Sequence, residues 1–264
     1  MEKVKIIIRK EWAEVFKNKM VIFTVAFLPL IMTALPLIIL YSTKGTGLSN
    51  SINTEMGQSI SAGMCPDNLN GSECFQVYLV SQFMMMFMLI PLAIPITIAA
   101  YSIVGEKNTR SLEPLLATPI STLELLVGKS LAAIIPAILA TYASFMLFIL
   151  GSWILIQSKN VLLAFLDIRW LIAIFIVGPL MSILAVSLSL MVSSRVNDPR
   201  AAEQISMVVI VPVLGLFFGQ MAGLFIINRQ IITITAICLI AIDLFALYIA
   251  IRVFDREAIL TKWK

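Results

Sequence analysis

Histidine is absent from all 264 residues of the chain, and its absence narrows the chemistry open to the protein. A chain without histidine has no His-based metal site, zinc-protease motif or Ser-His-Asp triad. The tripeptide Gly128-Lys129-Ser130 resembles the end of a phosphate-binding loop, but Leu123 occupies the position of the motif's first glycine. We therefore predict no catalytic residue, no metal site and no cofactor bound by this chain, and we do not expect an enzyme.

Charged residues are also scarce. They make up 13% of the sequence, hydrophobic residues make up 60%, and the mean hydropathy is +0.99. A soluble domain carries about 25% charged residues. The net charge of +4 is distributed over the ends of apolar runs, which argues against nucleic acid as a partner. The composition predicts an integral membrane protein, and the length suits a single transmembrane domain over residues 1–264.

Six apolar segments are each long enough to cross a hydrocarbon core of about 30 Å. Backbone groups in lipid must be satisfied internally, and the alternation of a barrel strand is missing, so the segments are predicted to be helices. The expected fold class is an all-α integral membrane protein with a lipid bilayer as its solvent. The predicted spans are residues 20–41, 77–104, 131–156, 170–192, 205–227 and 231–251.

Residues 1–19, before the first span, have the periodicity of an amphipathic helix. Lys3, Lys10 and Lys17 fall on the opposite side of the helical wheel from the apolar stripe. This pattern predicts a helix lying in the membrane interface, and a positive flank that only orients the first span is the alternative. The apolar stripe consists of Val4, Ile8, Trp12 and Val15.

The distribution of basic residues predicts the orientation of the chain in the membrane. Of the 19 Lys and Arg residues, 15 lie in the N-terminal segment, the 105–130 and 193–204 loops and the tail after Ile251. The positive-inside rule then places both termini and the 105–130 loop in the cytoplasm of a multi-pass cell-membrane protein. The connection at residues 42–76 becomes an outer loop.

Two of the three cysteines, Cys65 and Cys74, lie in the predicted outer loop. Their position predicts a disulfide bond in an oxidising space, and two free thiols are the alternative. The third cysteine, Cys238, falls within the sixth predicted span, where we expect a buried thiol.

Asp243 falls near the middle of the sixth predicted span and is a candidate intramembrane polar site. An acid within a membrane span is a functional candidate. No Lys, Arg or His lies within the spans to pair with it, which favours a structural carboxyl that is protonated or hydrogen-bonded inside the bundle.

Three glycines repeat every four residues at the end of the fifth span, namely Gly215, Gly219 and Gly223. Close helix packing is one interpretation of this spacing. A break in the helix, with part of the segment re-entering the membrane, is the other.

The segment Gly105–Ser130 is the longest charged interruption in the middle of the chain. It is predicted to form two short helices, the first closed by Pro119 and the second opened by a capping box at Ser121–Glu124. Leu112, Leu115 and Leu116 share one face of the first helix. Such a helix suits docking into a groove on a partner, and a helix resting on lipid is the alternative.

The sequence of this segment resembles that of type 2 permeases of ATP-binding cassette (ABC) transporters. Residues 105–129 read GEKNTRSLEPLLATPISTLELLVGK. The family pattern is a glutamate and a basic residue, Gly-Thr-Leu-Glu, a leucine pair, a small residue before Pro, and a final Gly-Lys. Here Arg110-Ser111 replaces the usual Gly-Thr. Residues 193–204 resemble the family's second cytoplasmic loop, and the interfacial helix and six spans match as well.

The resemblance implies a permease subunit, by family habit of an exporter. Such a permease pairs with a second copy, identical or related, and couples to a separate ATPase that binds ATP and Mg. Lys107 and Lys129 are expected to be solvated charges that set topology. The rival hypothesis is an ATP-independent secondary transporter, which should show internal repeats that this sequence lacks. The resemblance assigns coupling to the ATPase to Glu106, Arg110, Leu112, Glu113, Leu115 and Leu116.

Overall fold

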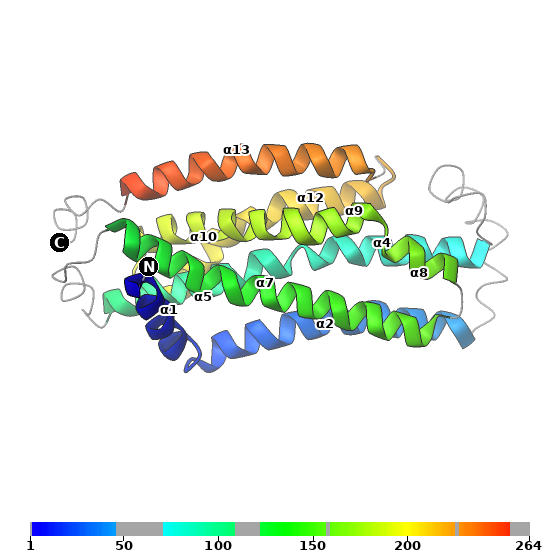
Figure 1. Cartoon of the computed structure of the whole chain (residues 1–264), viewed down its shortest axis with the longest axis horizontal. Helices are drawn as coiled ribbons and strands as arrows, with labels where there is room; N and C mark the ends of the chain where they lie inside the picture. The colour runs from blue at the N-terminus through cyan, green and yellow to red at the C-terminus, as the bar shows by residue number, and fades with distance from the viewer. Residues whose placement is uncertain (1, 46–70, 109–121, 157–158, 225–226, 254–264) are drawn as a thin grey trace.

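The computed structural model describes residues 2–45, 71–108, 122–156, 159–224 and 227–253. Within those ranges every regular element is helical, and the long helices lie side by side in one elongated bundle (Figure 1). The predicted fold class, an all-α membrane protein with six apolar helices, is confirmed. The stretches long and apolar enough to cross a membrane are Val21–Ser42, Glu73–Glu106, Leu123–Leu155, Val161–Arg195, Pro199–Met221 and Arg229–Ala250.

The six spans are built from helices of different construction. The first is α2 (Lys19–Gly45), which follows the short helix α1 (Glu2–Val15), and the third is the single helix α7 (Thr122–Leu155). The sixth is α13 (Arg229–Val253). The second span consists of α4 (Gly71–Phe87) and α5 (Ile90–Asn108). The fourth consists of α8 (Lys159–Phe165), α9 (Ile168–Ile172), the π-helical turn η1 (Ala173–Val177) and α10 (Gly178–Arg195). The fifth consists of α11 (Pro199–Ser206), the 3-10 turn η2 (Met207–Val209) and α12 (Ile210–Met221).

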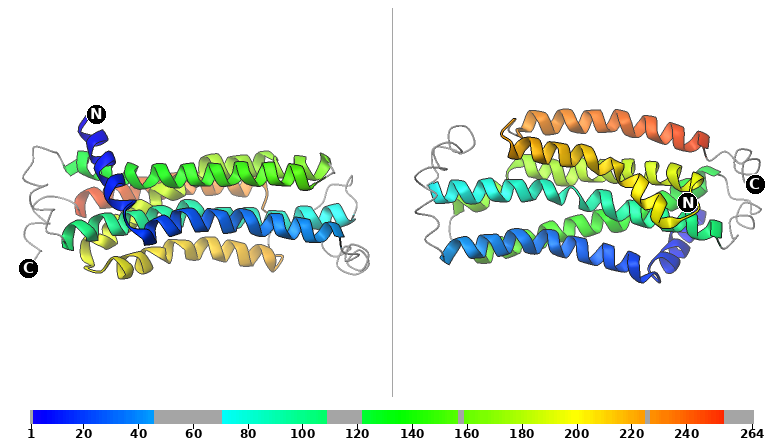
Figure 2. Two further views of the ribbon diagram at one scale, coloured as in Figure 1. Left: turned by 90° about the horizontal axis from the view of Figure 1, so that it is seen from below. Right: turned by 180° about the vertical axis from the view of Figure 1, so that it is seen from behind.

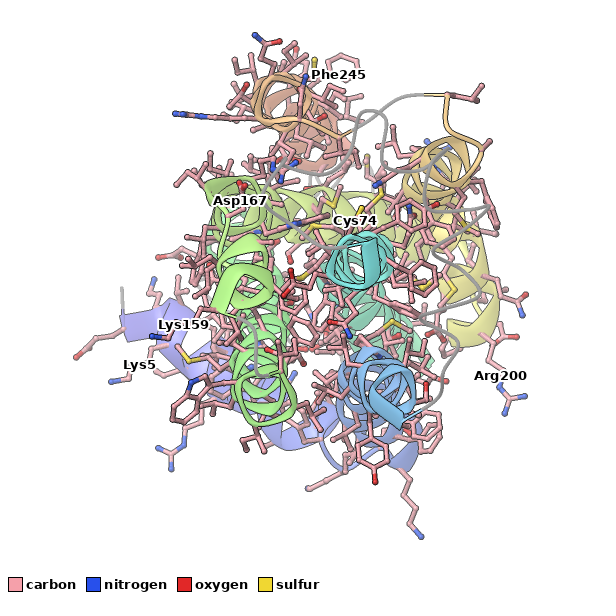
Figure 3. All side chains as sticks on the ribbon, turned by 90° about the vertical axis from the view of Figure 1, so that its right-hand side faces the viewer. Lys5, Cys74, Lys159, Asp167, Arg200 and Phe245 are labelled. Carbon is pink, nitrogen blue, oxygen red and sulfur yellow. The ribbon has the colours of Figure 1, made fainter. Side chains whose placement is uncertain are left out.

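The second span is the centre of the bundle. An 18-residue apolar stretch of it is 83% buried, against 17% for the corresponding stretch of the first span, because α5 packs against α2, α7 and α10. Figure 3, viewed along the bundle, shows α4 surrounded by the other helices. A helix enclosed in this way needs an apolar surface on every side, and residues 90–100 of α5 are all buried.

Proline chemistry shapes this central span. Pro95 has no N–H, so the carbonyl of Pro91, four residues earlier, loses its helical donor. The Ser182 hydroxyl of α10 donates to that carbonyl at 2.9 Å. The hydrogen bond satisfies a backbone group that lipid could not, and it ties α10 to α5.

The sixth span lies on the outside of the bundle and packs mainly on α10. Phe245 points away from the bundle in Figure 3 and is 65% exposed. Cys238 is also exposed, so the expected buried thiol is wrong. Its side chain falls outside the buried stripe of α13, whose members recur every three or four residues: Ile232, Ala236, Leu239, Asp243, Ala246 and Ala250.

The connections between spans are shorter than the hydropathy pattern predicts. Helix α5 continues through Asn108 and α7 begins at Thr122, so both ends of the predicted 105–130 loop are helical. The predicted second short helix of that loop is the first part of α7. At the other end, α2 reaches Gly45 and α4 begins at Gly71, which narrows the predicted 42–76 loop.

The fifth span ends at a glycine-dependent cap. Gly223 has φ 72°, its N–H donates to the Gln220 carbonyl at 3.0 Å, and the Leu224 N–H donates to the Gly219 carbonyl at 3.0 Å. These two bonds form a Schellman motif, which stops α12. At Gly215 an added Cβ would meet no atom within 4 Å, so close packing does not explain that glycine.

Candidate functional site

The candidate site is the junction of α1, α5 and α7, where α1 crosses one end of the bundle at a steep angle (Figures 1 and 2). The buried face of α1 is Ile7, Glu11 and Val15, one residue per helical turn. The predicted stripe therefore has the right period but is displaced around the helix, and it omits the acid at its centre. A helical-wheel analysis cannot identify Glu11 as a buried residue, because it places every acidic residue on the solvent-exposed face.

A glycine brings α1 into contact with α7. A Cβ added at Gly128 would lie 2.8 Å from the Cγ2 of Ile7, so only glycine allows this approach without a shift. Five residues further along α1, the Trp12 indole N–H donates to the Ala132 carbonyl at 2.9 Å. Helix α1 is thus attached to the first turns of α7 by both packing and a hydrogen bond.

Four charges meet beneath this contact. The Lys129 ammonium lies 2.8 Å from Glu11 Oε1 and 2.7 Å from Glu106 Oε2. It also donates to Ser102 Oγ at 2.9 Å, so two carboxylates and one hydroxyl surround the ammonium. Lys10 lies 2.7 Å from the other oxygen of Glu106, Oε1. We call Glu11, Glu106, Lys129 and Lys10 the charge cluster, and its formal charges sum to zero.

Burial makes these pairs strong and mutually dependent. Glu11, Glu106 and Lys129 are 2%, 3% and 4% exposed, so water contributes little to their solvation. Lys10 closes the cluster from its rim. Burial alone would lower its pKa, but the hydrogen bond to Glu106 and the carboxylates of Glu106, Glu14 and Glu11 raise the pKa above 10.5 overall. Lys10 therefore stays charged at neutral pH.

Helix α5 also contacts α11, which follows the α10–α11 connection at the same end of the bundle. There Asp198 caps α11, accepting from the Arg200 N–H at 3.0 Å. The Thr97 hydroxyl of α5 donates to Glu203 of α11 at 2.6 Å, and both side chains are buried. Arg200 itself is exposed and points away from the bundle (Figure 3). The end of α5 thus contacts α1, α7 and α11 together.

Comparison with known protein families shows which family the chain belongs to. Residues 5–257 match the family described as "ABC-2 family transporter protein". The chain belongs to this family. It is a multi-pass ABC permease subunit, the transport component rather than the catalytic one, and membership implies association with an ABC ATPase. No curated protein matches the chain.

The structure of the permease places some predicted site residues and not others. Glu106 is the central carboxylate of the charge cluster. The expectation that Lys129 is solvated is wrong, because α1 covers it. The remaining predicted coupling residues, Arg110, Leu112, Glu113, Leu115 and Leu116, lie outside the described residues.

Two further predictions concern other parts of the permease. Asp243 is 4% exposed, and neither carboxylate oxygen has a hydrogen-bond partner among the described residues. Cys74 is buried at the start of α4, and Cys65 lies outside the described residues, so their disulfide stays a prediction. Across the described ranges, no three His, Cys, Asp or Glu side chains are grouped closely enough to hold a metal ion.

Proposed function

We propose that this permease is the membrane-spanning half of an ABC exporter in the cell membrane. It pairs with a second permease copy, identical or related, to form the substrate pathway. A separate ATPase, which binds ATP and Mg, drives it from the cytoplasmic side. Both termini and the 105–130 connection face the cytoplasm, as the distribution of basic residues indicates.

The observation that carries this proposal is the charge cluster. Glu106 stands in the last turns of α5 and Lys129 in the first turns of α7, on the two sides of the 109–121 segment. Their 2.7 Å ion pair joins the two helices at the base of that segment. Movement imposed on the segment therefore reaches both helices together, because separating them would expose buried, unpaired charges.

Helix α5 is the route by which this movement spreads. It is the most enclosed part of the bundle and packs on α2, α7 and α10. The Thr97–Glu203 hydrogen bond connects it to α11 in the second connection on that side. We infer that nucleotide-driven closure of the ATPase pair shifts the permease between inward- and outward-facing states through α5.

Within the 105–130 segment, the proposed ATPase contact is the short stretch from Arg110 to Leu116. Leu112, Leu115 and Leu116 would provide the apolar face that docks into the ATPase. Arg110 and Glu113 would provide its polar contacts, and Glu106 would transmit the movement to the charge cluster.

The test uses the permease co-expressed with an ATPase and reconstituted in liposomes. We expect the Leu115→Asp, Leu116→Asp variant to lose co-purification of the ATPase and permease-stimulated ATP hydrolysis. Leu123→Asp is the matched control, because Leu123 is an exposed leucine in the first turn of α7 and should leave both readouts intact. A double variant that folds, binds the ATPase and transports normally would refute the docking role.

One observation favours the rival hypothesis, an ATP-independent secondary transporter, so the experiment must also test it. A buried acid without a partner, such as Asp243, is what a proton-coupled carrier uses. Uptake into vesicles should therefore be measured with ATP alone and with a proton gradient alone. Transport that needs the gradient and Asp243 but not ATP would replace our proposal with a secondary transporter.

A further inference from the structure

A groove lies between the last two spans, at the opposite end of the bundle from the charge cluster. Helix α12 packs on α4, whereas α13 packs on α10 and on α9–η1, so these consecutive helices form two separate walls. Figure 3 shows α13 standing apart from α12. Between them is a cavity of about 60 Å³. Its lining includes Met85, Met88, Trp170, Val213, Leu216 and Ile232.

The lining of this groove is suited to hydrocarbon and not to water. It presents no polar surface, and its one hydroxyl, that of Thr235, already donates to the Ile231 carbonyl at 2.8 Å. Water in such a space would lack hydrogen-bond partners. Met85, Met88 and Met181 provide an adaptable wall that can follow a flexible chain.

A π-helical turn forms part of the groove floor. Ala173 and Val177, the first and last residues of η1, both line the cavity. Single π-helical turns within α-helices are costly and recur at functional sites. The irregular turn thus coincides with the gap between α12 and α13.

The end of the groove carries positive charge. Arg169 precedes Trp170, and its guanidinium donates to the carbonyl of Ile227, a lining residue, at 3.4 Å. Asp167 pairs with Arg169 at 3.1 Å and neutralises it. Arg229 is exposed at the first position of α13, two residues before the lining residue Ile231. The rim therefore has one excess positive charge, at the end of a span where lipid headgroups lie.

We propose that this groove binds a phospholipid of the surrounding bilayer. Part of one acyl chain enters the space between α12 and α13, and the phosphate binds Arg229 with Arg169 beside it. An apolar groove with a cationic end complements an acyl chain joined to a phosphate, and guanidinium groups bind phosphate through charge-assisted hydrogen bonds. The site lies within one chain, so it needs neither the ATPase nor a second copy and stands apart from the proposed function.

The experiment uses purified full-length permease in nanodiscs containing phosphatidylglycerol with a photoreactive acyl chain, without ATPase or ATP. Peptide mapping should place the label on the groove lining. Leu216→Trp fills the groove and should reduce labelling there about tenfold, as expected when a steric block removes a binding mode. Val211→Trp is the matched control, because Val211 is 60% exposed on the same helix and should leave groove labelling unchanged.

The headgroup contact is tested by competition. Against a photoreactive diacylglycerol probe, unlabelled phosphatidylglycerol should compete about tenfold less well in Arg229→Ala, the loss expected for one charge-assisted hydrogen bond, and equally well in the control Arg200→Ala. Circular dichroism and melting temperature verify that each variant is folded. Label spread evenly over all lipid-facing helices and unaffected by Leu216→Trp would overturn the site. Equal competition by diacylglycerol, which has no phosphate, would overturn the headgroup assignment.

Discussion

Replacing Lys129 by methionine removes one of the two positive charges of the charge cluster and keeps most of the apolar stem. Glu11 and Glu106 then stay buried, 2% and 3% exposed, with Lys10 as the remaining cation of the charge cluster. Breaking a buried ion pair costs about 3–5 kcal/mol, because the remaining charge is left uncompensated. We expect Lys129→Met to lower the free energy of unfolding by about that amount.

A double-mutant cycle separates this electrostatic cost from a packing cost. Lys129→Met leaves the cluster with a net charge of −1, Glu11→Gln leaves it with +1, and the combined variant restores neutrality. The double variant should therefore be more stable than the sum of the single losses predicts, by about 2 kcal/mol or more. Glutamine keeps the size of Glu11 and can still bond Ser102, which makes it a suitable replacement.

The measurement is reversible unfolding of the purified permease in mixed micelles, followed by circular dichroism. The matched control is Lys3→Met, because Lys3 is on the same helix but its side chain is 51% exposed and 3.8 Å from Glu124. An exposed pair contributes less than about 1 kcal/mol. Additive single losses, or a Lys129→Met loss no larger than that of the control, would show that the cluster is not an electrostatic unit.

Three further predictions concern Gly128, Asp243 and the cysteine pair Cys65 and Cys74. Gly128→Leu should lower the melting temperature, because its side chain would collide with Ile7, and adding Ile7→Ala should restore much of the loss. Asp243→Asn should preserve ATP-driven transport and raise the melting temperature, since it removes a buried acid without a partner; lost transport in a folded variant would identify a functional acid. Cys65 and Cys74 should resist alkylation until a reductant is added, as mass spectrometry of protein from an oxidising host would show.

The alternation of apolar and polar segments was sufficient to predict the membrane class and the six helices. Crossing a bilayer is a local property, since each segment needs only enough apolar length to span the core and a helix to satisfy its own backbone. The Gly128-Lys129 pair was recognised from the sequence as part of a family pattern. Its physical role could not be predicted, because both residues act on α1, far away in the chain.

Tertiary structure alone decided which charges are buried. Lys129 and Glu11 are 118 residues apart, and Lys10 and Glu106 are 96 apart, so no local pattern connects them. A basic residue next to a polar loop is normally solvated, and an acid on an amphipathic helix normally faces water. Both expectations fail here because Gly128 lets α1 cover the ends of α5 and α7. The sequence determined the segments that cross the membrane; only the packing of α1 decided that four charges neutralise one another beneath it.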